Sequence, residues 1–216
     1  MAVEITTVMR EYLESLPQLK PVRQQFRINL PVESIQEMLF ETYKTFVGLR
    51  EIPFAEDADT KAMVRRCAHW LTGQYKPSIM LYGTHGNGKT TMSKALCHLI
   101  NYATPSEPVF SIAARDLSKK ARTLPNEFDE IIRRSKLCID DFGWEPATVK
   151  NYGNEINPIV EVIEERHKKL MLTILTSNQS DDKIIDTYGN YIYERLSEMC
   201  DMINYTHPSY RTGKKY

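Results

Sequence analysis

One glycine-rich stretch constrains this chain more than any other feature, because glycine is costly unless the backbone must turn sharply or approach a ligand. Residues 83–90, GTHGNGKT, match the phosphate-binding pattern G-x-x-x-x-G-K-[ST] at every fixed position. An apolar run with strand character precedes them at 78–82, and apolar residues recur at helical spacing from Met92 to Ile100. A strand, a loop and a helix therefore follow in the order that a phosphate-binding loop needs. The alternative, a glycine-rich turn without function, is disfavoured by this order.

Each part of the loop has a chemical role toward a nucleotide. Backbone N–H groups of such a loop surround a phosphate, and the N-terminus of the following helix adds partial positive charge. Lys89 is expected to reach the outer phosphates, and the Thr90 hydroxyl is expected to bind Mg²⁺, which prefers oxygen ligands. The sequence therefore predicts ATP and Mg²⁺ as cofactors. The residues predicted to bind the nucleotide are Gly83, Thr84, His85, Gly86, Asn87, Gly88, Lys89, Thr90 and Thr91.

Strands and helices alternate along most of the chain, which predicts an α/β fold. Strands are expected at 78–82, 109–114, 137–142, 170–177 and 202–206, with helices at 89–101, 116–123, 126–134 and about 154–168. We expect residues 56–216 to form a P-loop domain with a central five-stranded, mostly parallel sheet flanked by helices. Residues 1–55 are expected to be a helical N-terminal extension, with amphipathic helices at 5–16 and 35–47. This extension either docks onto a partner protein or packs on the core.

Two adjacent acids, Asp140 and Asp141, end the expected strand at 137–142. A buried strand end does not tolerate neighbouring carboxylates without a partner, and in a P-loop protein that partner is the nucleotide site. Asp140 is expected to hold Mg²⁺, directly or through water, and Asp141 is expected to orient or deprotonate the attacking water. Read alone, Asp-Asp-Phe-Gly also suits a surface turn, but the phosphate loop upstream favours the metal site.

Two later residues are further candidates. Asn178 follows a strand with a polar tip, at the carboxyl edge of the sheet where ligands bind, so it is expected to sense the outer phosphate or position water. Asn also suits a turn or a helix N-cap. Arg195 lies on an expected short helix. The residues alone leave it as a surface arginine beside a carboxylate or as an arginine finger that completes a neighbouring subunit's site.

The motifs occur in an order that resembles one group of proteins. IDDFGWEP at 139–146, LTSN at 175–178, YERL at 193–196 and SYR at 209–211 look like the AAA+ ATPases of the DnaC-type helicase-loader and IstB-type transposition-helper group. The resemblance covers the chain from about residue 50 to 216. It implies a Mg²⁺-dependent ATPase that acts as a homo-oligomer.

The resemblance also implies a role for each residue whose role the sequence pattern alone left open. It implies phosphate and magnesium binding by Lys89 and Thr90, magnesium binding by Asp140, catalysis by Asp141, sensing by Asn178 and a finger role for Arg195. Many AAA+ proteins have Glu where Asp141 stands, although this group often carries Asp. Few residues follow Arg195, so we expect no full helical lid domain, which this group also lacks.

The resemblance further implies an ATP-dependent helicase loader of a phage or mobile element, acting in DNA replication with a replicative helicase and single-stranded DNA. The alternative is a transposition helper that recruits a transposase. A small-molecule P-loop kinase is less favoured because no phosphate-binding arginine lid is apparent. A nucleotide-binding scaffold that does not hydrolyse ATP also stays open.

Charge gives only local hints about partners, since the chain has 28 Lys and Arg and 28 Asp and Glu residues. Basic clusters are either DNA contacts or solvated helix faces, and they comprise Lys119, Lys120 and Arg122, then Arg133, Arg134 and Lys136, then Arg211, Lys214 and Lys215. The four cysteines are scattered and make no metal-ligand pair. With no signal-peptide pattern and no long apolar run, we expect a cytoplasmic protein.

Overall fold

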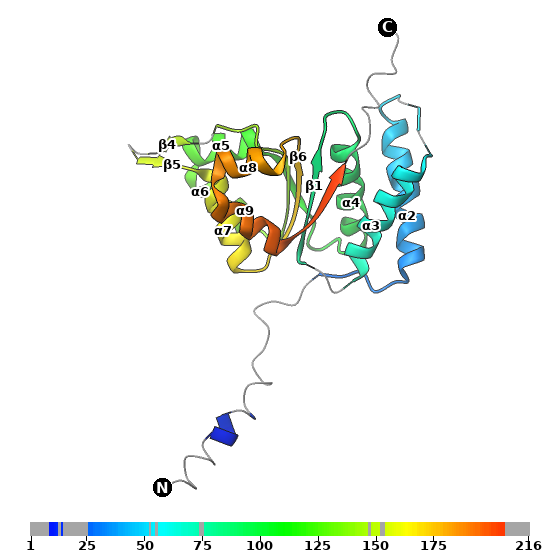
Figure 1. The fold of residues 1–216 in the computed structure, drawn as a ribbon, viewed down its shortest axis with the longest axis horizontal. Helices are drawn as coiled ribbons and strands as arrows, with labels where there is room; N and C mark the ends of the chain where they lie inside the picture. The colour runs from blue at the N-terminus through cyan, green and yellow to red at the C-terminus, as the bar shows by residue number, and fades with distance from the viewer. Residues whose placement is uncertain are drawn as a thin grey trace.

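The structure, a computed structural model, describes residues 9–12, 14, 26–51, 53–54, 56–73, 76–146, 148–151 and 154–205. At its centre is a five-stranded sheet with strand order β2–β3–β6–β1–β7, in which all neighbouring strands are parallel (Figure 1). The strands are β1 (Ser78–Gly83), β2 (Phe110–Ala113), β3 (Lys136–Phe142), β6 (Leu172–Ser177) and β7 (Cys200–Tyr205). The predicted five-stranded parallel sheet is confirmed.

Helices cover both faces of the sheet (Figure 1). One face carries α2 (Val32–Gly48), α3 (Ala58–Thr72) and α4 (Lys89–Ala103), and the other carries α5 (Ala114–Thr123), α6 (Pro125–Ile132), α7 (Pro158–Lys168), α8 (Asp181–Tyr188) and α9 (Asn190–Met199). Successive side chains of a strand face opposite sides, so in β1 Ile79 and Leu81 join the first core and Met80 joins the second. Central strands buried on both faces are mostly apolar, and β6 is buried along its whole length. Its buried hydroxyl residues Thr173, Thr176 and Ser177 each donate a hydrogen bond.

Helix α2 packs into the core that α3 and α4 build. Ile35 and Leu39 are fully buried there, and Tyr43 is nearly so. The hydrophobic contacts of α2 therefore cross the boundary predicted at residue 55. Most of the helix predicted at 5–16 lies outside the described residues. Within that range the structure describes residues 9–12 and 14, which are helical. The SYR motif at 209–211, with Lys214 and Lys215, also lies outside them.

The segment before α7 differs from the predicted helix at about 154–168. The structure forms a two-stranded antiparallel hairpin from β4 (Val149–Asn151) and β5 (Asn154–Ile156), and α7 begins only at Pro158. Asn157 caps this helix, because its side chain accepts a hydrogen bond from the Val160 amide at 3.2 Å. A proline in the first turn reinforces that start. The hairpin extends from the domain beside α5 (Figure 1).

No helix among the described residues is long and apolar enough to cross a membrane.

Candidate active site

The glycine-rich loop joins β1 to α4 in a backbone conformation that only glycine adopts readily. Gly83, Gly86 and Gly88 have positive φ angles of 124°, 80° and 94°. Gly88 also lies against α2, where an added Cβ would come within 2.2 Å of the Tyr43 hydroxyl oxygen. The positive φ angles thus favour glycine at all three positions, and the close approach of α2 also requires it at Gly88.

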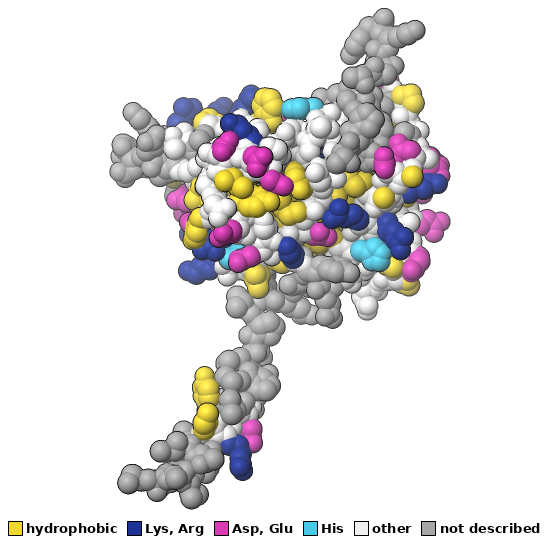
Figure 2. All heavy atoms as spheres, in the orientation of Figure 1, with side chains coloured by type: hydrophobic (Ala, Val, Ile, Leu, Met, Phe, Trp, Pro, Cys, Tyr) yellow, Lys and Arg dark blue, Asp and Glu magenta, His cyan; other side chains and the backbone are white. Residues whose placement is uncertain are grey.

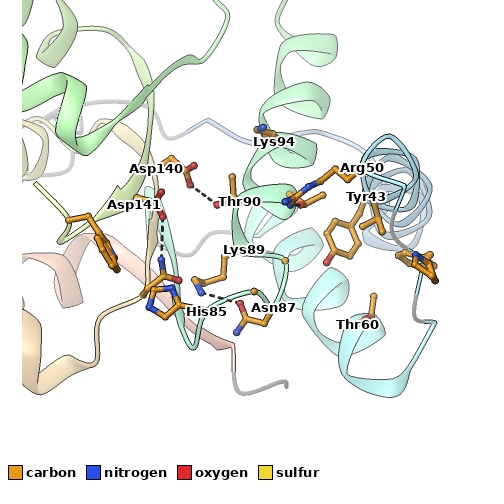
Figure 3. A pocket seen from close by; sticks show the side chains of 18 residues that line it. Tyr43, Arg50, Thr60, His85, Asn87, Lys89, Thr90, Lys94, Asp140 and Asp141 are labelled. Atoms are coloured by element: carbon orange, nitrogen blue, oxygen red, sulfur yellow. Dashed lines mark hydrogen bonds between the residues drawn. The ribbon is translucent and has the colours of Figure 1, made fainter. Parts of the chain in front are cut away.

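Lys89 lies within this loop and is only 4% exposed. Its ammonium group donates to the carbonyl oxygens of Gly83 at 3.1 Å and Thr84 at 2.6 Å, and to the Asn87 side chain at 3.0 Å (Figure 3). Asn87 is itself anchored, because its amide donates to the Tyr205 carbonyl oxygen at 2.8 Å. The positive charge is therefore held where the loop would surround a phosphate.

The two groups predicted to bind magnesium are in contact. The Thr90 hydroxyl donates to the Asp140 carboxylate at 3.0 Å (Figure 3). The Thr176 hydroxyl from β6 donates to the same carboxylate oxygen. A hydroxyl and a carboxylate are hard oxygen ligands, which fit Mg²⁺. Among the described residues, no group of three His, Cys, Asp or Glu side chains could hold a metal alone.

A bulge at the end of β3 places both acids on the same pocket. In a regular strand, adjacent side chains face opposite sides of the sheet. The register of β3 with β6 shifts between Ile139 and Phe142, and Asp141 has a positive φ of 57°. The Asp141 amide donates to the Thr176 hydroxyl at 3.0 Å, and the Asp141 carboxylate accepts a hydrogen bond from the Asn178 side chain at 3.3 Å. Asp140 and Asp141 consequently line one pocket.

The turn after β3 is fixed to α8 and to the loop before it. Glu145 is buried, and its carboxylate accepts hydrogen bonds from the Gly143 amide at 2.9 Å and from the Tyr188 hydroxyl. This burial raises the pKa of the Glu145 carboxyl above its usual range. The Gln179 side chain donates to the Gly143 carbonyl oxygen at 3.1 Å. These contacts hold the strained backbone that carries Asp141.

The pocket has a volume of about 500 Å³, and α2 forms one wall that the sequence analysis did not assign to the site. The unassigned lining residues are Tyr43, Val47, Arg50, Pro53, Phe54, Thr60, Lys94 and Trp144. Apolar periodicity indicated that α2 buries one face, but it does not tell a pocket wall from a core contact. Trp144, half exposed, meets the His85 ring edge-on with 5.6 Å between centroids.

The pocket brings together residues 85–91 with Asp140, Asp141 and Asn178, but Arg195 lies elsewhere. The Arg195 guanidinium stacks on the Tyr191 ring, 4.0 Å from its centroid, and donates to the Tyr191 hydroxyl. It also lies 3.5 Å from the His167 Nδ1 atom. Arg195 does not line the pocket of its own chain, which both the finger and the surface interpretations require.

The basic residues of α5 differ in exposure and in ion pairing. Arg115, Lys119 and Arg122 are exposed at spacings of four and three residues, so they share one helix face, which we call the α5 stripe. Lys120 instead pairs with Glu127 at 2.5 Å. In the next predicted cluster, Arg133 pairs with Asp129, Lys136 is buried beside Glu107, and Arg134 covers the Phe110 ring.

Comparison with known proteins identifies the fold. No protein-family model matches the sequence, and no curated protein matches it significantly. Solved structures do match. The DnaC helicase loader has a TM-score of 0.59 at 16% identity, over 71% of this chain and 94% of that one. DnaI has a TM-score of 0.59 at 17% identity, over 86% and 96%. AMPPCP-bound DnaA from Aquifex aeolicus has a TM-score of 0.52 at 16% identity, over 69% and 48%. The chain therefore shares its fold, a five-stranded parallel sheet flanked by helices, with DnaC and DnaI, as its motifs predicted.

Proposed function

We propose that this chain is an ATP-dependent helicase loader that hydrolyses Mg·ATP and acts in DNA replication with a replicative helicase and single-stranded DNA. The observation that carries this proposal is the convergence of Lys89, Thr90, Asp140, Asp141 and Asn178 on one pocket. The fold that surrounds this pocket is shared with the DnaC helicase loader. DnaA, of the same fold, binds AMPPCP, a nucleotide with three phosphates.

The pocket residues can perform each step that hydrolysis needs. The loop amides and Lys89 hold the phosphates in a fixed orientation. Thr90 and Asp140 would hold Mg²⁺, which neutralises charge on the outer phosphates when bound. Asp141 lies beside them and can accept a proton from water or orient it. Asn178 donates to the Asp141 carboxylate and thereby limits its rotation.

Substitution of the loop lysine tests nucleotide binding. Lys89→Ala is expected to lower ATP affinity roughly tenfold to a hundredfold, because it removes a charge-assisted hydrogen bond to phosphate. The fold should persist, since the hydrogen bonds from Lys89 to Gly83, Thr84 and Asn87 lie within the loop and the apolar cores do not include it. Isothermal titration with ATP measures the affinity, and circular dichroism checks the fold. Unchanged ATP affinity in folded Lys89→Ala protein would overturn the nucleotide site.

The α5 stripe is the surface proposed to contact single-stranded DNA. Changing Arg115, Lys119 and Arg122 together to Gln should weaken binding and reduce the slope of log affinity against log salt by about 2, since each lost phosphate contact removes roughly 0.7. Fluorescence anisotropy with a labelled oligonucleotide at several salt concentrations measures both.

A matched control separates the stripe from a general loss of charge. Lys44, Arg65 and Lys183 are exposed on α2, α3 and α8, and changing all three to Gln removes the same charge. This control should keep the wild-type salt slope. If the two triple variants have the same slope, the α5 stripe is a solvated helix face.

The partner protein is the part of the proposal that most needs a direct experiment. Purified protein with ATP should retain a replicative helicase in a pulldown and should not retain a transposase. The opposite result would favour the transposition helper, the alternative that shares these motifs.

A further inference from the structure

Arg50 extends from the end of α2 into the nucleotide pocket (Figure 3). Its guanidinium donates to the Thr91 hydroxyl at 3.1 Å. Thr91 is almost fully buried in the first turn of α4, immediately after the two residues that hold the phosphate and metal positions. A positive charge from the segment before α3 therefore lies against the start of the phosphate-binding helix.

The side of the pocket on which Arg50 lies indicates which part of a nucleotide it can contact. Thr90 faces Asp140, whereas the next residue, Thr91, faces Arg50 (Figure 3). Successive residues of a helix point about 100° apart, so the acid and the arginine flank α4 from different directions. The metal and the outer phosphates belong to the Asp140 side. Arg50 instead lies beside the wall that α2 forms.

That wall is built mainly from apolar and aromatic side chains. Tyr43, Val47 and Phe54 line it, and the Tyr43 and Phe54 rings meet edge-on with 5.9 Å between centroids. Such a surface suits the flat face of a base. A nucleotide with its base on this wall and its outer phosphates at Lys89 has its α-phosphate between the two, next to Arg50.

The charge on Arg50 is available for a ligand. Among the described residues, no carboxylate forms an ion pair with it, and Thr91 is its hydrogen-bond acceptor. A guanidinium has five N–H donors in a planar fork that matches phosphate oxygens. One hydrogen bond to a hydroxyl leaves most of these donors free.

We propose that Arg50 binds the α-phosphate of the nucleotide, in the same chain that supplies the loop. This inference rests on the proposed function, because it requires a nucleotide in the pocket. It adds a phosphate ligand that comes from outside the glycine-rich motif, on a segment continuous with α2.

A series of ligands that differ in phosphate number tests the assignment. ATP, ADP, AMP and adenosine each displace a fluorescent ADP analogue from wild-type and Arg50→Gln protein. The variant should lose affinity by the same factor for all three phosphorylated ligands, on the order of tenfold. Adenosine affinity should stay unchanged, and Arg50→Lys should recover part of the loss.

The control is Lys44→Gln, which removes one positive charge from the exposed face of α2, the helix that precedes Arg50, and it should leave all four affinities unchanged. Melting temperatures of both variants show whether either change unfolds the protein.

Several results would overturn the assignment. An equal loss for adenosine would place Arg50 on the base wall, and a loss confined to ATP would place it at the outer phosphates. Unchanged affinity for every ligand would leave Arg50 with no part in binding. Failure of the wild-type protein to bind any of the ligands is a different result, because it would overturn the proposed function itself.

Discussion

Asp141→Asn is expected to bind Mg·ATP with nearly wild-type affinity and to hydrolyse it roughly 10²- to 10⁴-fold more slowly, the range that a positioned general base contributes. The amide keeps the size of the carboxylate and can still contact Asn178, but it cannot accept a proton from water. Phosphate release in the steady state measures turnover, and nucleotide displacement measures binding. The two readouts should separate, with turnover lost and affinity kept.

Two further variants serve as controls for Asp141→Asn. Asp140→Asn should weaken Mg²⁺-dependent nucleotide binding first, because its carboxylate is in contact with the Thr90 hydroxyl. Asp186→Asn changes an exposed acid on α8, away from the pocket lining, and should leave turnover unchanged. If Asp141→Asn hydrolyses ATP at the wild-type rate, the catalytic acid lies elsewhere.

Arg195→Ala is expected to bind ATP nearly normally and to hydrolyse it about 10³-fold more slowly, the effect of removing an arginine finger. The residue lies outside the pocket of its own chain, so any catalytic contribution must go to a neighbouring subunit. To reach the pocket of a neighbouring subunit, the Arg195 side chain must break its contacts with the ring and the hydroxyl of Tyr191. Wild-type specific activity should rise with protein concentration as subunits assemble.

A mixing experiment decides the finger role. An Arg195→Ala subunit has an intact Lys89 pocket, and a Lys89→Ala subunit still carries Arg195. At an ATP concentration that the Lys89→Ala pocket does not fill, each is expected to be inactive alone. Their mixture should regain part of the activity, because the arginine of the second subunit completes the pocket of the first. Arg133→Ala, which removes another exposed arginine, should remain active alone. If the two inactive variants co-assemble and activity does not return, Arg195 is a surface residue held by Tyr191 and His167.

The local pattern of apolar residues predicted most helices and strands, because burial of those residues is what stabilises these elements. Central strands buried on both faces are mostly apolar, so the apolar runs within β1, β3 and β6 placed these strands to within about two residues. The glycine-rich loop was equally readable, since its positive φ angles and the approach of α2 leave no room for side chains. Its position between a strand and a helix was predicted from the apolar patterns on either side of it.

Features that depend on contacts between distant segments could not be read this way. The wall formed by Tyr43, Arg50 and Phe54 exists because α2 packs beside α4, and periodicity says only that α2 has an apolar face. The bulge directs the Asp140 and Asp141 side chains into the same pocket. It depends on the register of β3 with β6, which a local sequence pattern does not determine. The hairpin before α7 was missed because Asn157 and Pro158 start the helix later than its apolar residues suggest.

The aromatic contact at the mouth of the pocket gives the protein an optical probe of its own. The chain has two tryptophans. Trp70 is 1% exposed in the core, whereas Trp144 is 51% exposed, meets the glycine-rich-loop residue His85 edge-on and follows Asp140 and Asp141 by a few positions. A water-soluble quencher such as iodide should therefore reach Trp144 and spare Trp70. Changes in the quenching of Trp144 fluorescence would then report, without any label, when a ligand binds at the loop.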